Sequence, residues 1–197
     1  NELLSPMIKK LNLTNDEKSN LRTFLESLIG ENINILIADT PKLYFDTETK
    51  KIIKKHLPEY KIVGQANYSF LIWNIYDATL ITKSGEFNDD EFVLVLKYNK
   101  VIKKERLVDE TINEFKKQAE FKEEYLNNLR LIFNETFKKT KVNSVFVGIK
   151  IKKQAYLYFE GEEVFKTNDK KFINHFFNIW LREDSQNPSF TKKLLGK

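Results

Sequence analysis

The sequence contains no cysteine, and this absence excludes several kinds of chemistry at once. A chain without thiols has no disulfide framework, no thiol nucleophile and no thiolate metal site. It is indifferent to redox conditions, so the cytoplasm and the periplasm suit it equally. We predict no cofactor and no metal site.

Recognisable catalytic motifs are also missing. The chain has no G-x-S-x-G, no phosphate-binding glycine loop and no H-E-x-x-H, so hydrolase, nucleotide-binding and zinc-protease functions have no support. The two histidines, His56 and His175, have no histidine or carboxylate at metal-ligand spacing. For His175 we expect a hydrogen bond to a backbone carbonyl instead of a role as a catalytic base. No catalytic residue is predicted.

Arginine is scarce: only four of the 33 basic residues are Arg, and the rest are Lys. Nucleic-acid recognition relies on Arg and on basic residues clustered with aromatic ones, and we find no such cluster. The net charge of +5 therefore indicates a solvated lysine surface, and we predict no nucleic-acid partner. The first residues, NELLSPMIKK, lack the apolar core of a signal peptide, so a leader is either already cleaved or was never there.

The longest apolar run covers residues 64–82 and has one charged side chain, Asp77. Its polar residues are too many for a membrane helix, and its β-branched and aromatic content favours a strand. Large apolar side chains occupy both the odd-numbered and the even-numbered positions, so both faces of a strand would be apolar. We therefore predict the central strand of a sheet that is covered on both faces. No transmembrane segment is predicted. For Asp77 we expect a bond to nearby backbone or to a cation such as Lys97 across the sheet.

Elsewhere the spacing of apolar residues indicates alternating strands and helices. We predict short strands at 91–99, 145–151, 155–159 and 163–166, and helices at 107–138 and 171–182. Lys122 interrupts the apolar stripe of the first helical region, which indicates one bent helix or two joined helices. This order of elements predicts an antiparallel α+β fold.

The N-terminal part divides into two further segments. Residues 1–31 are predicted to be a helical extension, and 32–62 short strands and a basic connector before the main domain, 63–197. An apolar stripe along residues 14–30 needs a surface to cover, so a protein partner could dock there.

Two stretches resemble one known family. The first stretch, residues 73–115, contains WNIYDATL, the turn KSGEFND and the segment EFVLVLKYNKVIKKERLVDETINEF. It and FFNIWLREDSQNPSFTKKLLGK, residues 176–197, are similar to the bacterial chalcone isomerase-like family. The resemblance spans about Val63 to Gly196. It implies an α+β, chalcone isomerase-like open-faced β-sandwich with an antiparallel sheet packed against helices. Because members often carry a leader, it also favours a periplasmic or secreted protein over a cytoplasmic one.

The same resemblance guides the functional prediction. Plant chalcone isomerases hold the substrate's charge with an arginine whose position here is Ser69, and residues 23–105 contain no arginine. Fatty-acid-binding relatives use an arginine and a tyrosine for the carboxylate, so the same missing arginine argues against fatty-acid binding unless Lys97 or Arg130 takes its place. We therefore predict a non-catalytic protein that binds an apolar or fatty-acid-like ligand, with an interaction module of a larger assembly and an isomerase as alternatives. Candidate ligand-binding residues are Tyr68, Ser69, Tyr76, Tyr98, Lys97 and Arg130.

A cleft, if one is present, is expected between the apolar run and the 107–138 helices, near the break at Lys122. We favour the alternative, a core filled by phenylalanines such as Phe115 and Phe133. In either case we predict that Tyr76 and Trp180 pack in the same core, since their segments are the two most apolar of the chain.

Overall fold

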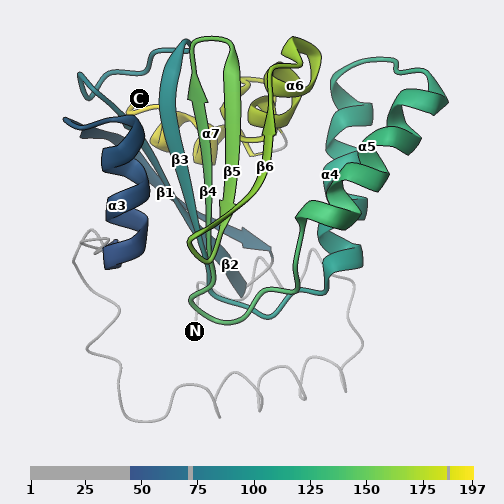
Figure 1. Ribbon diagram of the computed structural model, residues 1–197, viewed down its shortest axis with the longest axis horizontal. Helices are drawn as coiled ribbons and strands as arrows, with labels where there is room; N and C mark the ends of the chain where they lie inside the picture. Colours follow the sequence, from purple (N-terminus) through teal and green to yellow (C-terminus); the bar gives the residue numbers. More distant parts are fainter. Residues whose placement is uncertain (1–44, 71–72, 186) are drawn as a thin grey trace, which may run out of the picture. The chain divides into compact units, whose positions relative to one another are not determined.

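Six antiparallel strands form one sheet in which sequence neighbours are also spatial neighbours (Figure 1). The computed structural model describes residues 45–70, 73–185 and 187–197. The strands are β1 (Lys61–Phe70), β2 (Trp73–Thr82), β3 (Glu91–Tyr98), β4 (Val145–Ile151), β5 (Gln154–Phe159) and β6 (Glu162–Thr167). The described residues belong to one compact unit, Phe45–Lys197.

Five helices accompany the sheet in the described residues: α3 (Thr47–His56), α4 (Lys104–Gln118), α5 (Glu123–Thr136), α6 (Lys170–Leu181) and α7 (Pro188–Leu194). Three of these helices have an N-cap residue whose side chain accepts a hydrogen bond from a first-turn amide. The N-cap residues are Asp46 for α3, Asp169 for α6 and Asn187 for α7. Within the described ranges, none of these helices is both long and apolar enough to cross a bilayer. The antiparallel α+β fold is as predicted.

The two faces of the sheet pack against different helices. Alternate residues of β3, such as Phe92, Leu94 and Leu96, join one core cluster with apolar residues of α4, α5, α6 and α7. Val93 and Val95 have the opposite parity and are also buried. Helix α3 contacts β4, and its own buried residues are Thr49, Ile52 and Ile53. The core that can hold a site is therefore the one beneath α4, α6 and α7.

The apolar run 64–82 is not one central strand, and that prediction was wrong. The chain reverses between Phe70 and Trp73, which face each other where β1 and β2 pair. β1 is an edge strand, and α7 packs closely against it at Gly64. A Cβ on Gly64 would lie only 2.1 Å from the carbonyl oxygen of Lys193, so this contact needs glycine.

Helix α3 lies where the sequence suggested a basic connector. The Asp46 carboxylate accepts from the Thr49 amide at 2.7 Å, and Ile52 and Ile53 turn inward from between the exposed lysines. Lysine is a good helix former, so a lysine-rich stretch with a cap and one apolar pair is a helix when a sheet face is there to cover. The predicted extension (1–31) and its docking stripe (14–30) lie outside the described residues.

Candidate functional site

A cavity of about 800 Å³ lies between the sheet and the helices α4, α6 and α7. Tyr68 of β1, Tyr76 of β2 and Tyr98 of β3 line it from the sheet side. From the helices it is lined by Leu107 and Thr111 of α4, Ile179 and Trp180 of α6, and Phe190 of α7. The cavity lies between the apolar run and the helical layer, where a cleft was expected if one formed, and the filled core that we favoured is wrong.

The three phenols form a connected aromatic floor because they lie side by side on neighbouring strands. Tyr68 stacks on Tyr76 with ring centres 4.9 Å apart, and Tyr98 meets Tyr76 edge to face at 5.8 Å. The indole Nε1 of Trp180 donates to the Tyr76 hydroxyl at 3.0 Å. The prediction that Tyr76 and Trp180 share one core is confirmed.

These phenols stay protonated at neutral pH. Burial raises the pKa of Tyr76 and of Tyr98, and burial followed by the nearby Glu114 carboxylate raises the pKa of Tyr68. No described residue hydrogen-bonds the hydroxyl of Tyr68 or Tyr98. The floor therefore offers neutral O–H donors on an otherwise apolar surface, and no general base.

We had expected the cavity near the break in the helical region at Lys122, but it does not lie there. Lys122 is the N-cap residue of α5. The rings of Phe121, Tyr125 and His175 pack next to that break. The first half of α4 and the end of α5 line the cavity instead. The lysine marked the end of one helix and the start of another, and aromatic packing closes the space beside it.

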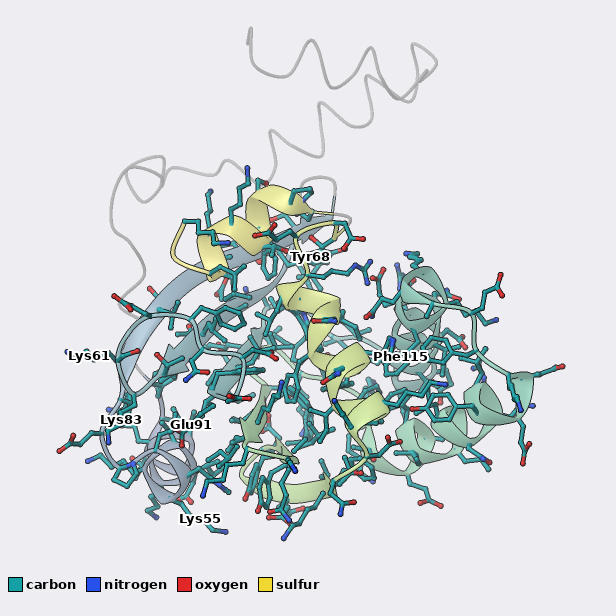
Figure 2. All side chains as sticks on the ribbon, turned by 90° about the horizontal axis from the view of Figure 1, so that it is seen from above. Lys55, Lys61, Tyr68, Lys83, Glu91 and Phe115 are labelled. Atoms are coloured by element: carbon teal, nitrogen blue, oxygen red, sulfur yellow. The ribbon has the colours of Figure 1, made fainter. Side chains whose placement is uncertain are left out.

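The phenylalanines expected to plug the space pack elsewhere. Phe115 and Phe133 are fully buried and contact each other and Phe172. Figure 2 labels Phe115, and it lies in the interior beside α6, away from the cavity lining. The core is therefore filled next to the cavity without occupying it.

A group of basic side chains lines the outer part of the cavity. Lys103, Arg106 and Lys138 are exposed there, and Lys100 is half-exposed. Arg106 lies in the first turn of α4, and no described residue forms a hydrogen bond or ion pair with its side chain. Sequence reasoning passed over Arg106 because it stands one residue before the predicted helix 107–138, where its direction could not be assigned.

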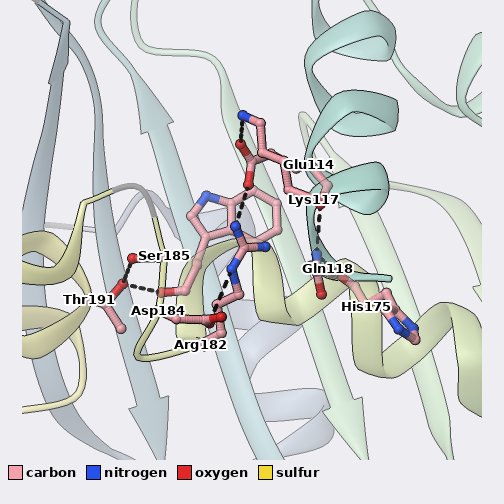
Figure 3. A network of polar contacts seen from close by, with 9 residues as sticks. Glu114, Lys117, Gln118, His175, Arg182, Asp184, Ser185 and Thr191 are labelled. Atoms are coloured by element: carbon pink, nitrogen blue, oxygen red, sulfur yellow. Dashed lines mark hydrogen bonds and ion pairs between the residues drawn. The ribbon is translucent and has the colours of Figure 1, made fainter. Parts of the chain in front are cut away.

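On the inner wall of the cavity, the Glu114 carboxylate forms ion pairs with two cations. Glu114 of α4 accepts from Lys117 at 2.7 Å and from Arg182 at 3.1 Å, and Arg182 is also 3.5 Å from Asp184 (Figure 3). The Arg182 side chain is only 11% exposed. Arg182 has two carboxylate partners and does not line the cavity, so its charge is balanced within the protein.

Of the six predicted binding residues, the structure brings three together. Tyr68, Tyr76 and Tyr98 line the cavity, whereas Ser69, Lys97 and Arg130 do not. Ser69 is exposed and pairs with Asn74 at the edge of the sheet. Arg130 reaches back from α5 to Asp109 of α4.

The Lys97 side chain lies on the opposite face of the sheet from the three phenols, because Lys97 directly precedes Tyr98 in β3 and successive strand residues alternate between the two faces. It lies opposite Asp77 in the β2–β3 pairing. The Asp77 carboxylate accepts hydrogen bonds from the side-chain amides of three asparagines, Asn67, Asn74 and Asn99. Asp77 is thus a structural acceptor whose donors are side-chain amides, not the backbone or cation we had expected.

The histidines have structural partners. The Nδ1 of His175 donates to the carbonyl oxygen of Lys171 at 2.7 Å, which confirms the predicted backbone bond. His56 contacts Tyr156 and Tyr158 on the side of the sheet where α3 packs. In the described part of the chain, no three histidine or acidic side chains gather in a way that could hold a metal ion.

Comparison with known proteins supports the fold. No family model and no curated protein matches the sequence. The structure is similar to the crystal structure of AtFAP1, a fatty-acid binding protein of Arabidopsis thaliana. The TM-score is 0.54 at 12% sequence identity, and the match covers 70% of this chain and 87% of the other. The predicted chalcone isomerase-like fold, an open antiparallel sheet packed against helices, is confirmed.

Proposed function

We propose that this protein binds a fatty-acid-like molecule in the cavity and catalyses no reaction on it. The observation that carries the proposal is the cavity itself: about 800 Å³, with mostly aromatic and aliphatic walls. Pockets for small ligands commonly measure roughly 300 to 1,000 Å³ and are lined in this way. The similar fold of a fatty-acid binding protein supports the same ligand class.

The charges around the cavity orient such a ligand. The exposed part of the cavity has the cations Lys103, Arg106 and Lys138 and one carboxylate, Glu110, whereas the inner wall carries the Glu114 carboxylate. A carboxylate placed deep in the cavity would meet that negative charge and lose its water without a cation to replace it. The ligand therefore enters tail first, with its carboxylate left among the cations at the mouth.

Chalcone cyclisation is the alternative reaction that the resemblance suggests, and the inner part of the site lacks the cation that this reaction requires. A cation must stabilise the developing phenolate or enolate. Ser69 cannot supply one and does not line the cavity. We expect the protein to leave the rate of chalcone cyclisation in buffer unchanged, and saturable, stereospecific turnover would contradict the non-catalytic proposal.

We further propose, from the resemblance in sequence, that the protein belongs to the bacterial branch of the fold and acts in the periplasm. The absence of cysteine is compatible with that compartment. Fractionation of the source cells tests this proposal, and recovery of the protein in the cytoplasm would reject it.

The orientation of the ligand can be tested with one substitution at the mouth. Replacing Arg106 with Gln removes a cation but keeps a polar side chain of similar length. We expect affinity for a long-chain fatty acid to fall about three- to tenfold, because a partly solvated charged hydrogen bond is lost. Affinity for the alcohol of the same chain length should not change, since an alcohol carries no charge.

Arg130→Gln is the matched control, because Arg130 pairs with Asp109 outside the cavity. It should leave both affinities as they are. Equal losses of acid and alcohol binding in Arg106→Gln would contradict the tail-first orientation. Isothermal titration calorimetry measures all four affinities.

A further inference from the structure

Two connecting segments lie next to each other at the outer part of the cavity: residues 99–103, between β3 and α4, and 137–144, between α5 and β4 (Figure 1). We call them the mouth loops. The buried Thr140 joins them: its hydroxyl donates to the Lys100 carbonyl oxygen at 2.8 Å and accepts from the Ile102 amide at 2.8 Å. Its own amide donates to the Ile102 carbonyl oxygen at 3.0 Å. The two loops therefore form one fixed surface.

The mouth loops and the first turn of α4 together carry a strong excess of positive charge. Residues 100–106 hold four cations and one carboxylate, and residues 137–143 hold three cations and no carboxylate. The whole chain, by contrast, has 33 basic and 28 acidic residues and a net charge of +5. A positive field concentrated in this way attracts a negatively charged surface. The seven cations are Lys100, Lys103, Lys104, Arg106, Lys138, Lys139 and Lys141.

Apolar side chains stand exposed between these cations. Val101 is 56% exposed and Val142 is 57% exposed, one on each mouth loop. Val142 occupies a tight turn in which the Ser144 amide donates to the Lys141 carbonyl oxygen at 3.1 Å. The Asn143 amide donates to the Tyr98 carbonyl oxygen at 2.7 Å, which attaches the turn to the end of β3. These hydrogen bonds hold the turn in place with the Val142 side chain exposed to solvent.

We propose that the mouth loops dock the protein onto an anionic lipid bilayer. Val101 and Val142 enter the interface, and the surrounding cations meet the negative headgroups. The inference rests on the proposed function, because a fatty acid that enters at the mouth would come from that bilayer. A nucleic acid fits this surface less well, since six of the seven cations are lysines and the exposed apolar residues are valines, on which no base can stack.

Co-sedimentation of the full chain with lipid vesicles tests the proposal. One vesicle type is phosphatidylcholine alone, and the other has about one phosphatidylglycerol to three phosphatidylcholines. We expect the protein to sediment with the anionic vesicles only and to be released by salt. Lys139→Glu/Lys141→Glu should weaken partitioning more than about tenfold. Val101→Ser/Val142→Ser should weaken it several-fold with the charge unchanged.

The matched control is Lys54→Glu/Lys153→Glu, which makes the same change in charge at exposed sites on α3 and in the β4–β5 turn. It should retain most of the binding. Equal loss in the control, unchanged binding by both mouth-loop variants, or binding to a DNA duplex without binding to vesicles would overturn the proposal.

Titration of a fatty acid in the absence of vesicles separates this inference from the proposed function. If the fatty acid binds and the vesicles do not, only the docking surface is wrong. If vesicles bind through the mouth loops and the fatty acid does not bind, the docking surface stands and the cavity needs another ligand.

Discussion

Trp180 connects the cavity floor to the helical layer through a single hydrogen bond. Its indole donates to Tyr76 at 3.0 Å and packs edge to face on Phe176 at 5.4 Å. A buried Tyr hydroxyl or Trp N–H needs a partner, and here each group supplies the other's. The pair therefore fixes the distance between β2 and α6, which is the depth of the cavity.

Truncation of Trp180 to Ala should destabilise the fold by about 3 kcal/mol, because it removes both the packing of the ring and the donor to Tyr76. Tyr76→Phe, which removes only the hydroxyl, should cost about 1 kcal/mol. Urea denaturation measures both values. Leu131→Ala, at a 64% exposed site on α5, is the control and should change stability by less than about 0.5 kcal/mol. A midpoint unchanged in Trp180→Ala would refute the packing.

Single residues also show where sequence reasoning stops. Tyr68, Tyr76 and Tyr98 were predicted because their phenols stand in or beside apolar strands, although such tyrosines more often only pack in a core. Arg106 was not predicted, because α4 begins three residues before the predicted helix 107–138. Ser69, Lys97 and Arg130 were plausible by residue type, but the parity of their strands and the Asp109 partner direct them away from the cavity.

At the scale of elements, helix α3 is held on its face of the sheet by a polar contact that responds to pH. The His56 Nε2 lies 3.0 Å from the hydroxyl of Tyr158, which in turn donates to Glu163 at 2.9 Å. Burial, then Lys55 and Lys166, lower the pKa of His56, and Glu163 opposes them. The imidazole is therefore neutral in the fold and donates its Nε2–H to Tyr158.

Because the pKa of His56 is lower in the fold than its ordinary value of 6.5, the unfolded chain takes up the proton first as pH falls. The stability that His56 contributes should be complete above about pH 6.5 and decline below it. We expect thermal denaturation to show a smaller loss of Tm between about pH 7.5 and 5.5 in His56→Gln than in the wild type. Parallel pH profiles for the two proteins would contradict this account.

Most elements of the described region follow from periodicity and caps. The helices on either side of Lys122, the capped α6, and the strands β3, β4, β5 and β6 occur within a few residues of their predicted ends. The β1–β2 hairpin was missed because the residues between Phe70 and Trp73 are Leu and Ile. Neither belongs to the glycine and asparagine types that favour a tight hairpin turn. Two strands in succession then look like one long strand with both faces apolar.

For the molecule as a whole, the fold explains why a cavity exists beside a well-filled core. The sheet leaves an angle with α4, and the ring cluster of Phe115, Phe133 and Phe172 fills only one end of it. At the other end, the aromatic floor and Trp180 face open space, and the cavity remains. Exposed basic side chains line the outer part of this cavity, so one site combines apolar walls with a positively charged mouth.

The most direct test of this account is calorimetric titration of the full chain with a long-chain fatty acid, beside a variant that fills the cavity. Ile179→Trp places an indole in the cavity, whereas Leu131→Trp adds the same group at an exposed site. We predict saturable binding of one fatty acid per chain, at least about tenfold weaker in Ile179→Trp and unchanged in Leu131→Trp. Absence of binding by the wild type, or equal binding by both tryptophan variants in their folded state, would contradict the claim that this cavity is the lipid site.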